Sequence, residues 1–262
     1  MESQLDAVWT ARPEVLTFHF GLPDAKVIEK AHSLNISFGV CATSVEEAAQ
    51  IVEHGADFVV AQGYEAGGRR GTWLKDSELP TLELVQQIRT AFPDIPIAAA
   101  GGIMNGKDIE RALDAGSDAV WMGTGFMSVA ETSKKTGNIH LQVIQENVEK
   151  SKLLGDHLPQ QTTVTPCFTG IRARAIENQF VKAVHSAEEH GSNDPPILPF
   201  PHQYYATAPF RATNDKEYLP LLTGAGYTNC RFLTVQELMI KLSEEFQQAT
   251  KQYNDEKAKS EL

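Results

Sequence analysis

The sequence contains no long hydrophobic run and few cysteines, and both shortages narrow the kinds of protein it can encode. No apolar stretch among the 262 residues approaches the roughly 18 residues that a membrane-spanning helix needs, so we expect no transmembrane segment. The first twenty residues lack the basic and then apolar pattern of a signal peptide. The three cysteines are odd in number, widely spaced and without a metal-ligand pattern, which predicts reduced, buried thiols.

Positive charge is also scarce. The chain has 23 Lys and Arg residues against 34 Asp and Glu residues, a formal net charge of −11, which argues against non-specific nucleic-acid binding. With 42% hydrophobic and 22% charged residues, the chain can bury a core. Reduced thiols predict a cytoplasmic location. The final Ser260-Glu261-Leu262 is near a peroxisomal tripeptide but carries an acid where a base is expected.

Short apolar runs alternate with amphipathic stretches through the first half of the chain. The candidate strands are residues 15–20, 36–41, 58–61, 95–100 and 119–122, and the candidate helices are residues 24–34, 44–55, 81–92 and 107–115. Strands and helices that alternate at this spacing predict parallel βα units. One pattern occurs twice: residues 55–59 (GADFV) and 116–120 (GSDAV) each combine a glycine helix stop with a buried strand.

The pattern changes after residue 130. Residues 138–153 and 234–248 have helical periodicity, residues 165–181 form a second organised patch, and residues 186–216 hold five of the thirteen prolines. We therefore predict two regions: a partial (βα) barrel over residues 1–130, and a helical, proline-rich region over residues 131–262 that packs on it.

The central strand leads into a glycine-rich loop. The segment VVAQGYEAGGRRGTW ends an apolar run at Gln62 and then places glycines at positions 63, 67, 68 and 71. At the end of a strand in a βα architecture, glycines let main-chain amides come close to a ligand. The other interpretation of these glycines is a flexible surface loop.

Two further glycine loops, Gly101-Gly102 and Gly123-Thr124, follow the last two candidate strands. In TIM barrels a phosphate commonly sits on the loops after the seventh and eighth strands. Main-chain N–H groups there, with the start of a short helix, form an anion site that needs no Lys or Arg. The alternative is that these loops are tight turns that merely connect a strand to a helix.

Several segments together resemble the class I nitronate monooxygenases, formerly 2-nitropropane dioxygenases, which are FMN enzymes on a TIM barrel. The similar segments are VLTFHFGLP, AQGYEAGG, AAGGI, VWMGTGF and FTGIRARAIENQF, which occur in the family's order over most of residues 12–182. GAGYTNCR and the helix after it resemble the family's C-terminal element more loosely.

The resemblance implies a TIM-barrel-like (βα) parallel sheet and an FMN cofactor. Gln62 and the loop glycines would contact the flavin, Gly102 would hold its phosphate, and the VWMGTGF segment would close over it. The implied cofactor-binding residues are Gln62, Gly67, Gly68, Gly101, Gly102, Trp121, Met122, Gly123 and Thr124. His19 would face the flavin; its other interpretation is a structural histidine in an apolar strand.

The sequence departs from the family at the position after EAGG, where the family has a histidine that removes a proton from the carbon next to the nitro group. Here the residue is Arg69. A guanidinium keeps its proton at any usable pH, so Arg69 cannot be the general base. It could attract an anion or stabilise a reduced flavin. A nitronate is already deprotonated, so we expect oxidation of alkyl nitronates by molecular oxygen, with His19 as a replacement base if neutral nitroalkanes react.

The second departure is length. If residues 95–100 and 119–122 are the seventh and eighth barrel strands, counting back gives five units, and the first three have no counterpart in this sequence. We therefore expect an N-terminally shortened barrel, a fragment, or a barrel that closes with a partner chain or as a homo-oligomer. Five strands would expose two unpaired edges and an apolar inner face.

Two other functions fit parts of the sequence. A flavin enoyl-acyl-carrier-protein reductase has a similar loop, but that family also uses histidine after the glycines. A non-enzymatic barrel that binds a partner, or FMN without turnover, is favoured by Arg69 and by the missing units. A flavin spectrum in the purified protein would separate an enzyme from a binding protein.

Overall fold

The structure, a computed structural model, describes residues 2–75, 77–133, 138–154, 161–189 and 196–260. Contacts group the chain into two compact units that interleave along the sequence. Unit 1 comprises residues 1–64, 71–100 and 111–121, and unit 2 comprises residues 65–70, 101–110 and 122–262. Three predicted site loops therefore belong largely to unit 2, although the strands that lead into them belong to unit 1.

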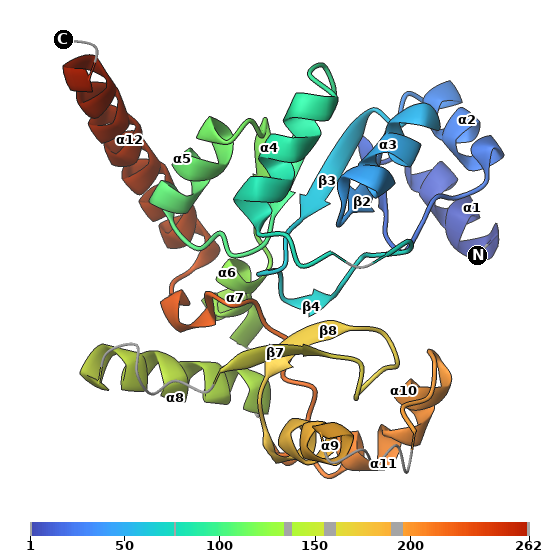
Figure 1. Cartoon of the computed structure of the whole chain (residues 1–262), viewed down its shortest axis with the longest axis vertical. Coiled ribbons are helices and arrows are strands. Elements are labelled where there is room, and N and C mark those ends of the chain that lie inside the picture. Colours follow the sequence, from blue (N-terminus) through green and yellow to red (C-terminus); the bar gives the residue numbers. More distant parts are fainter. Residues whose placement is uncertain (1, 76, 134–137, 155–160, 190–195, 261–262) are drawn as a thin grey trace. The chain divides into compact units, whose positions relative to one another are not determined.

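Unit 1 is built on a five-stranded parallel sheet with the order β1-β2-β3-β5-β6. Its elements are α1 (Glu2–Ala11), β1 (Val15–Phe18), α2 (Ala25–Ser33), β2 (Ser37–Ala42), α3 (Val45–Glu53), β3 (Phe58–Gln62), α4 (Thr81–Ala91), β5 (Ile97–Ala100), the end of α5 (Gly106–Asp114) and β6 (Ala119–Trp121). Helices α2, α3 and α4 pack against β2, β3 and β5 (Figure 1). All five predicted strands and all four predicted helices are confirmed; α1 was not predicted.

Each strand of the sheet pairs in parallel with the strand that follows it in the sheet order, as successive strands of a TIM barrel do. The middle of the sheet is fully covered: Val40 and Val59 have no exposed surface. Its edges are open, since Val15 on β1 is 52% exposed and Trp121 on β6 is 44% exposed. Crossover helices explain the continuous apolar runs in the central strands. Among the described residues, β1 and β6 are the two end strands of this sheet, and the expectation that these edges are unpaired in the protein stays a prediction.

The sequence pattern that occurs at 55–59 and 116–120 corresponds to a repeated set of aspartate hydrogen bonds. The carboxylate of Asp57, before β3, accepts a hydrogen bond from the main-chain N–H of Phe38, at 2.7 Å, and pairs with His32 on α2. Asp118 does the same two βα units later, before β6: it accepts from the N–H of Ile97, at 2.8 Å, and pairs with Arg89 on α4. Each aspartate thus fastens the start of one strand to its neighbour and to a covering helix.

Glu47 fixes the segment that returns to unit 1 after the glycine-rich loop. The predicted capping box is half formed, because the Ser44 hydroxyl accepts from the N–H of Glu47. The fully buried Glu47 carboxylate then binds the segment 72–74. It accepts from the Thr72 hydroxyl and from the main-chain N–H groups of Trp73 and Leu74, at 2.7–3.0 Å.

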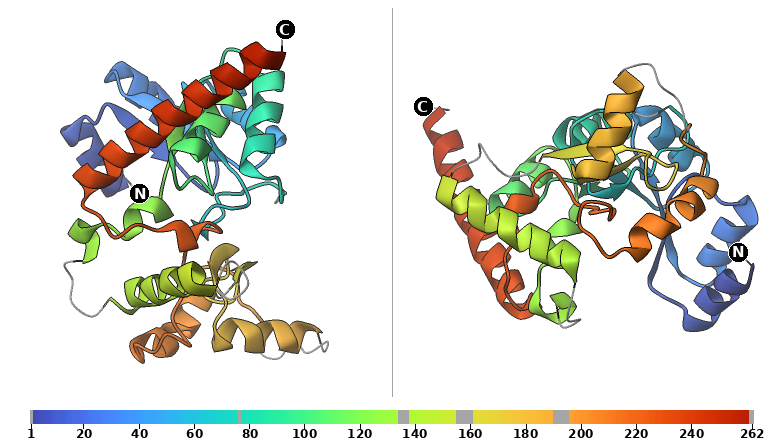
Figure 2. Two further views of the ribbon diagram at one scale, coloured as in Figure 1. Left: turned by 90° about the vertical axis from the view of Figure 1, so that its left-hand side faces the viewer. Right: turned by 90° about the horizontal axis from the view of Figure 1, so that it is seen from below.

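Unit 2 is organised around a second, antiparallel sheet with the order β4-β8-β7. Its elements are β4 (Gly68–Arg69), the start of α5, α6 (Thr124–Met127), α7 (Ala130–Ser133), α8 (Ile139–Leu154), β7 (Thr162–Thr165), β8 (Ala173–Ile176), α9 (Gln179–Glu189), α10 (His202–Ala206), α11 (Ala208–Ala212), the 3₁₀ turn η2 (Tyr227–Asn229) and α12 (Val235–Ser260). The predicted helices over 138–153 and 234–248 are confirmed, and α12 runs further, to Ser260, as one continuous rod (Figure 2). The strands β7 and β8 were not predicted.

The core of unit 2 joins α8 to the turn η2. Ile144, Val148, Leu221 and Tyr227 are buried there in one cluster. A second cluster surrounds Phe168 beneath α9. Within the described residues, no helix is long and apolar enough to cross a membrane.

Candidate functional site

In unit 1 the candidate site residues lie at the carboxyl ends of the parallel strands. Gln62, Ala100 and Trp121 are register partners on β3, β5 and β6, so they form one row across the sheet. The small side chain of Ala100 separates the two larger ones. Gln62 is buried, and its Oε1 accepts a hydrogen bond from the main-chain N–H of Gly71, at 2.7 Å. It therefore braces the return of the glycine-rich loop.

His19 follows directly after β1, at the far edge of the same sheet. Its ring lies 6.5 Å from the ring of Trp121, centroid to centroid, with edge-to-face geometry. The two edge strands therefore bring their ends together, as the curvature of a barrel wall requires. His19 belongs to the exposed residues, and the partial burial of its ring lowers the pKa of the imidazole below its usual value. A neutral imidazole at this position can accept a proton.

In unit 2 the glycine turns from distant parts of the sequence come together. A Cβ built on Gly67 would lie 2.3 Å from the main-chain N of Gly224 and 2.9 Å from Oγ1 of Thr124. The Thr124 hydroxyl in turn accepts a hydrogen bond from the N–H of Gly224, at 2.9 Å. A side chain at position 67 would clash with Gly224 and Thr124, so this position requires glycine.

The Gly101-Gly102 turn joins the same cluster. Both residues have positive φ, 122° and 69°, which favours glycine. A Cβ on Gly102 would lie 3.1 Å from Cβ of Glu65, and one on Gly226 would lie 3.6 Å from the carbonyl oxygen of Gly102. The N–H of Ala225 donates to the Glu65 carbonyl, at 3.0 Å, which fastens the turn at 224–226 to the glycine-rich loop.

This cluster leaves main-chain donors available. In the part of the chain that the structure describes, no group accepts a hydrogen bond from the N–H of Gly102, Gly123 or Thr124. Gly123 also has open space where a side chain would stand, because no atom lies within 4 Å of a Cβ built there. Unused N–H groups at glycine turns form a site for an anion such as a phosphate.

Arg69 lies on β4, paired with Ala173 of β8, and its neighbour Gly68 has a φ of 75° with open space beside it. The Arg69 guanidinium lies 5.1 Å from the centroid of the Phe200 ring, a cation–π distance. This contact holds the side chain while leaving its positive charge in place. Arg69 therefore has a structural role in addition to any contact with a substrate.

The structure thus gathers Gln62, Trp121 and His19 in unit 1, and the remaining predicted residues in unit 2. The unit 2 residues are Gly67, Gly68, Arg69, Gly101, Gly102, Met122, Gly123 and Thr124. Gly224 and Gly226 belong to the same cluster and were not predicted. The signal that could have found them is the glycine pair in GAGYTN. The described residues contain no group of three or more His, Cys, Asp or Glu side chains that could hold a metal ion.

Comparisons with known proteins identify the family of this chain. A model of the family "Nitronate monooxygenase" matches residues 1–245. The chain belongs to the nitronate monooxygenase family. A nitronate monooxygenase of Pseudomonas aeruginosa is 33% identical over 241 residues, which is 89% of this chain and 64% of the relative. A nitronate monooxygenase of Paraburkholderia phytofirmans is 33% identical over 248 residues, or 92% of this chain and 63% of the relative.

Solved structures give the same picture. Nitroalkane oxidase from Streptomyces ansochromogenes has a TM-score of 0.80 and 33% identity, with 96% of this chain and 69% of that chain covered. FabK of Thermotoga maritima, with a TM-score of 0.73 and 23% identity over 97% of this chain and 74% of that one, shares the fold. The TIM-barrel-like class of the parallel sheet is therefore confirmed. The chain spans between 59% and 66% of the length of the curated relatives that it matches.

Proposed function

We propose that this nitronate monooxygenase family member is an FMN-dependent oxidoreductase that oxidises alkyl nitronates with molecular oxygen. Family membership supports an oxidoreductase of this type. The observation that carries the cofactor assignment is the set of main-chain donors at Gly102, Gly123 and Thr124 that no described residue accepts from, beside an open space at Gly123. A phosphate group fits such a set because it accepts several hydrogen bonds at once and needs no charged partner.

The chain's own residues would divide the work of holding the cofactor and the substrate. The turns at 101–102 and 123–124 would donate N–H groups to the FMN phosphate, and Gly224 would keep the Thr124 side chain in place through its hydrogen bond. When bound, the flavin would supply the electron chemistry, accepting electrons from the substrate and passing them to oxygen. The positive charge of Arg69 would favour an anionic substrate.

Arg69 also sets the form of the substrate. Removing a proton from a neutral nitroalkane requires a general base, and the guanidinium is permanently protonated. A nitronate has already lost that proton. We therefore expect the protein to oxidise alkyl nitronates and to leave neutral nitroalkanes almost untouched, with His19 as the side chain that could restore reaction with them.

The test is flavin reduction without oxygen, followed by absorbance, with a nitronate and with its parent nitroalkane kept neutral. The wild-type protein should react with the nitronate at least about a hundredfold faster, the usual contribution of one general base. Arg69→His should raise the rate with the neutral form, whereas Arg69→Lys, which keeps the charge, should not.

Equal rates of the wild-type protein with both forms would contradict the role given to Arg69. If His19→Ala then abolished reaction with the neutral form, His19 would be identified as the base. A protein that binds FMN but reduces it with neither form would be a flavin-binding protein without this activity.

A further inference from the structure

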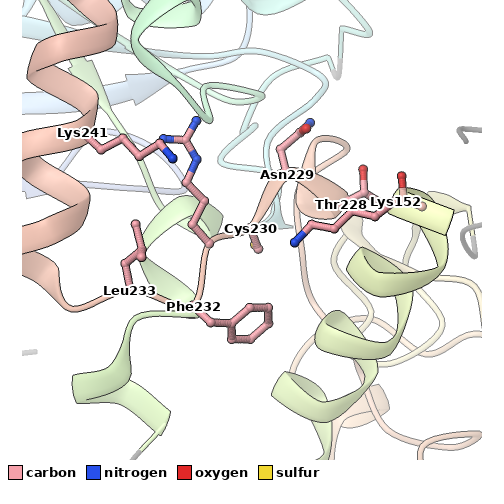
Figure 3. A pocket seen from close by; sticks show the side chains of 9 residues that line it. Lys152, Thr228, Asn229, Cys230, Phe232, Leu233 and Lys241 are labelled. Atoms are coloured by element: carbon pink, nitrogen blue, oxygen red, sulfur yellow. The ribbon is translucent and has the colours of Figure 1, made fainter.

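A pocket of about 690 Å³ lies within unit 2, and part of its lining closely follows Gly226 of the glycine cluster in sequence. It is formed by the end of α8, the segment that runs through and beyond η2, and the first turns of α12 (Figure 3). Its lining residues are Ser151, Lys152, Thr228, Asn229, Cys230, Arg231, Phe232, Leu233 and Lys241. None of them belongs to the predicted flavin site. The volume is that of a typical small-molecule site, about 300–1,000 Å³.

The charge of this lining is opposite to that of the whole chain. Lys152, Arg231 and Lys241 are cationic, and no acidic residue is among the described residues of the lining. The chain itself has 34 acidic and 23 basic residues. Figure 3 shows Lys241 reaching in from α12 on one side and Lys152 from α8 on the other. Like charges that converge in this way repel one another unless an anion lies between them.

Arg231 has spare hydrogen-bonding capacity. Its Nη2 pairs with the carboxylate of Glu245, at 3.0 Å, which fixes the guanidinium. Its Nη1 is buried and, among the described residues, donates no hydrogen bond. A buried donor without an acceptor is costly. A bound oxyanion would satisfy it and would meet the planar guanidinium in its preferred geometry.

The remaining walls suit a ligand with an apolar ring. Phe232 is 41% exposed, and its ring stands beside the pocket in Figure 3. Thr228, Asn229 and Ser151 add neutral polar groups. The thiol of Cys230 adds no charge, because burial raises its pKa to about 11.

We propose that this pocket binds a phosphorylated small molecule of nucleotide size. Lys152, Arg231 and Lys241 would hold its phosphates, and the Phe232 ring would stack on its base. Glu245 balances the charge of Arg231, which leaves the two lysine charges. Two positive charges match an anion with more than one negative charge, which a diphosphate carries and a single carboxylate does not. The pocket shares no lining residue with the site proposed for FMN, although the Cys230 thiol donates to the Thr124 carbonyl, at 3.4 Å. Its test does not require flavin chemistry.

The experiment is isothermal titration of the full chain with ADP, inorganic pyrophosphate and adenosine at low salt. ADP should bind, pyrophosphate should bind more weakly, and adenosine should show no binding at the same concentration. Lys152→Ala and Lys241→Ala should each weaken ADP binding by about tenfold or more, as expected for the loss of one charged hydrogen-bond partner. Phe232→Ala should lower ADP affinity to that of pyrophosphate.

The matched control is Lys150→Ala, since Lys150 is exposed on the same helix two residues before Lys152 and does not line the pocket. It should leave the affinity unchanged. The proposal is overturned if ADP does not bind, or if the Lys152, Lys241 and Lys150 variants all bind ADP like the wild-type protein. It is also overturned if FMN competes with ADP and Gly123→Ala abolishes both, because the phosphates would then occupy the glycine turns. Retained ADP binding in a chain that fails to bind FMN would support this site and count against the flavin proposal alone.

Discussion

At the scale of single residues, the glycines of unit 2 differ in whether a side chain would fit in their place. Gly67 faces the main chain of Gly224, with only 2.3 Å for a Cβ, whereas Gly123 faces open space and has an ordinary φ of −98°. We predict that Gly67→Ala destabilises the fold by about 1–3 kcal/mol or more, because the backbone must shift to admit a methyl group. Urea unfolding measures this.

Gly123→Ala is the control for that prediction, because its methyl group meets no atom of the described residues within 4 Å. Its free energy of unfolding should stay within about 0.5 kcal/mol of the wild-type value. If Gly67→Ala were equally harmless, the close approach of residues 67 and 224 would be wrong.

His140, on α8, predicts a dependence of stability on pH. Burial lowers its pKa from 6.5 to about 4, and its Nε2 is buried without a hydrogen-bond partner among the described residues. The unfolded chain therefore binds a proton more readily than the folded one between these pH values. The free energy of unfolding should fall as the pH drops below about 6.5, and this loss should be complete near pH 4.

The size of the effect is at most about 3 kcal/mol, from about 2.5 pKa units at 1.36 kcal/mol each. His140→Phe should remove this part of the acid sensitivity, measured as the difference between two urea-unfolding series at pH 7 and pH 4.5. Identical pH profiles for the two proteins would show that His140 is not buried in its neutral form.

Most members of the candidate site, but not all, could be predicted from the sequence. The glycines at 67, 101, 102 and 123 could be found from their positions after apolar runs, since that is where βα architectures bind ligands. Gly224 was not predicted: the glycine pair in GAGYTN was its one signal, no strand precedes it, and its role comes from a contact with Gly67 that is 157 positions away in sequence (224 − 67). Whether each residue binds FMN stays a prediction.

At the scale of elements, one buried carboxylate connects helix α3 to the segment that follows the glycine-rich loop. Glu47 accepts from two groups of Thr43 and from three groups in residues 72–74. Glu47→Gln keeps the shape but replaces one acceptor oxygen with an amide that donates, so buried donors lose their partner. We predict a loss of about 2–4 kcal/mol in the free energy of unfolding.

Glu46→Gln provides the matched control, because Glu46 is exposed in the same helical turn. It should change stability by no more than about 0.5 kcal/mol. Proteolysis near residues 72–74 should also become faster in Glu47→Gln and not in Glu46→Gln. Equal stability of the two variants would show that the Glu47 hydrogen bonds are replaced by water at little cost.

Hydrophobic periodicity predicted the elements of unit 1 well and those of unit 2 less well. The central strands of the parallel sheet are buried on both faces, so they stand out as continuous apolar runs such as FVVA before Gln62. The strands β7 (TTVT) and β8 (ARAI) are four residues each and carry polar side chains, so they have no such signal. The capping-box pattern at Ser44 predicted the start of α3. The side chain of its glutamate, Glu47, instead accepts hydrogen bonds from residues 72–74.

At the scale of the whole molecule, the chain forms two units that interleave along the sequence. The parallel sheet and the family follow from the sequence, because long periodic segments and several spaced motifs agree with each other. The interleaving of the two units does not follow from the sequence, because it depends on which loop packs against which distant segment. Association with a second copy or another chain across the open edges at Val15 and Trp121 stays a prediction.

The most direct measurement compares the binding of FMN and riboflavin to the full chain by flavin fluorescence. The two ligands differ only in the phosphate, so their affinities separate the contribution of the main-chain donors at Gly102, Gly123 and Thr124 from that of the ring. We predict that FMN binds at least about a hundredfold more tightly, as several hydrogen bonds to a charged group would give, and that Gly123→Ala removes most of this difference while the protein stays folded. Equal affinity for FMN and riboflavin, or no binding of either, would contradict a phosphate site at these turns.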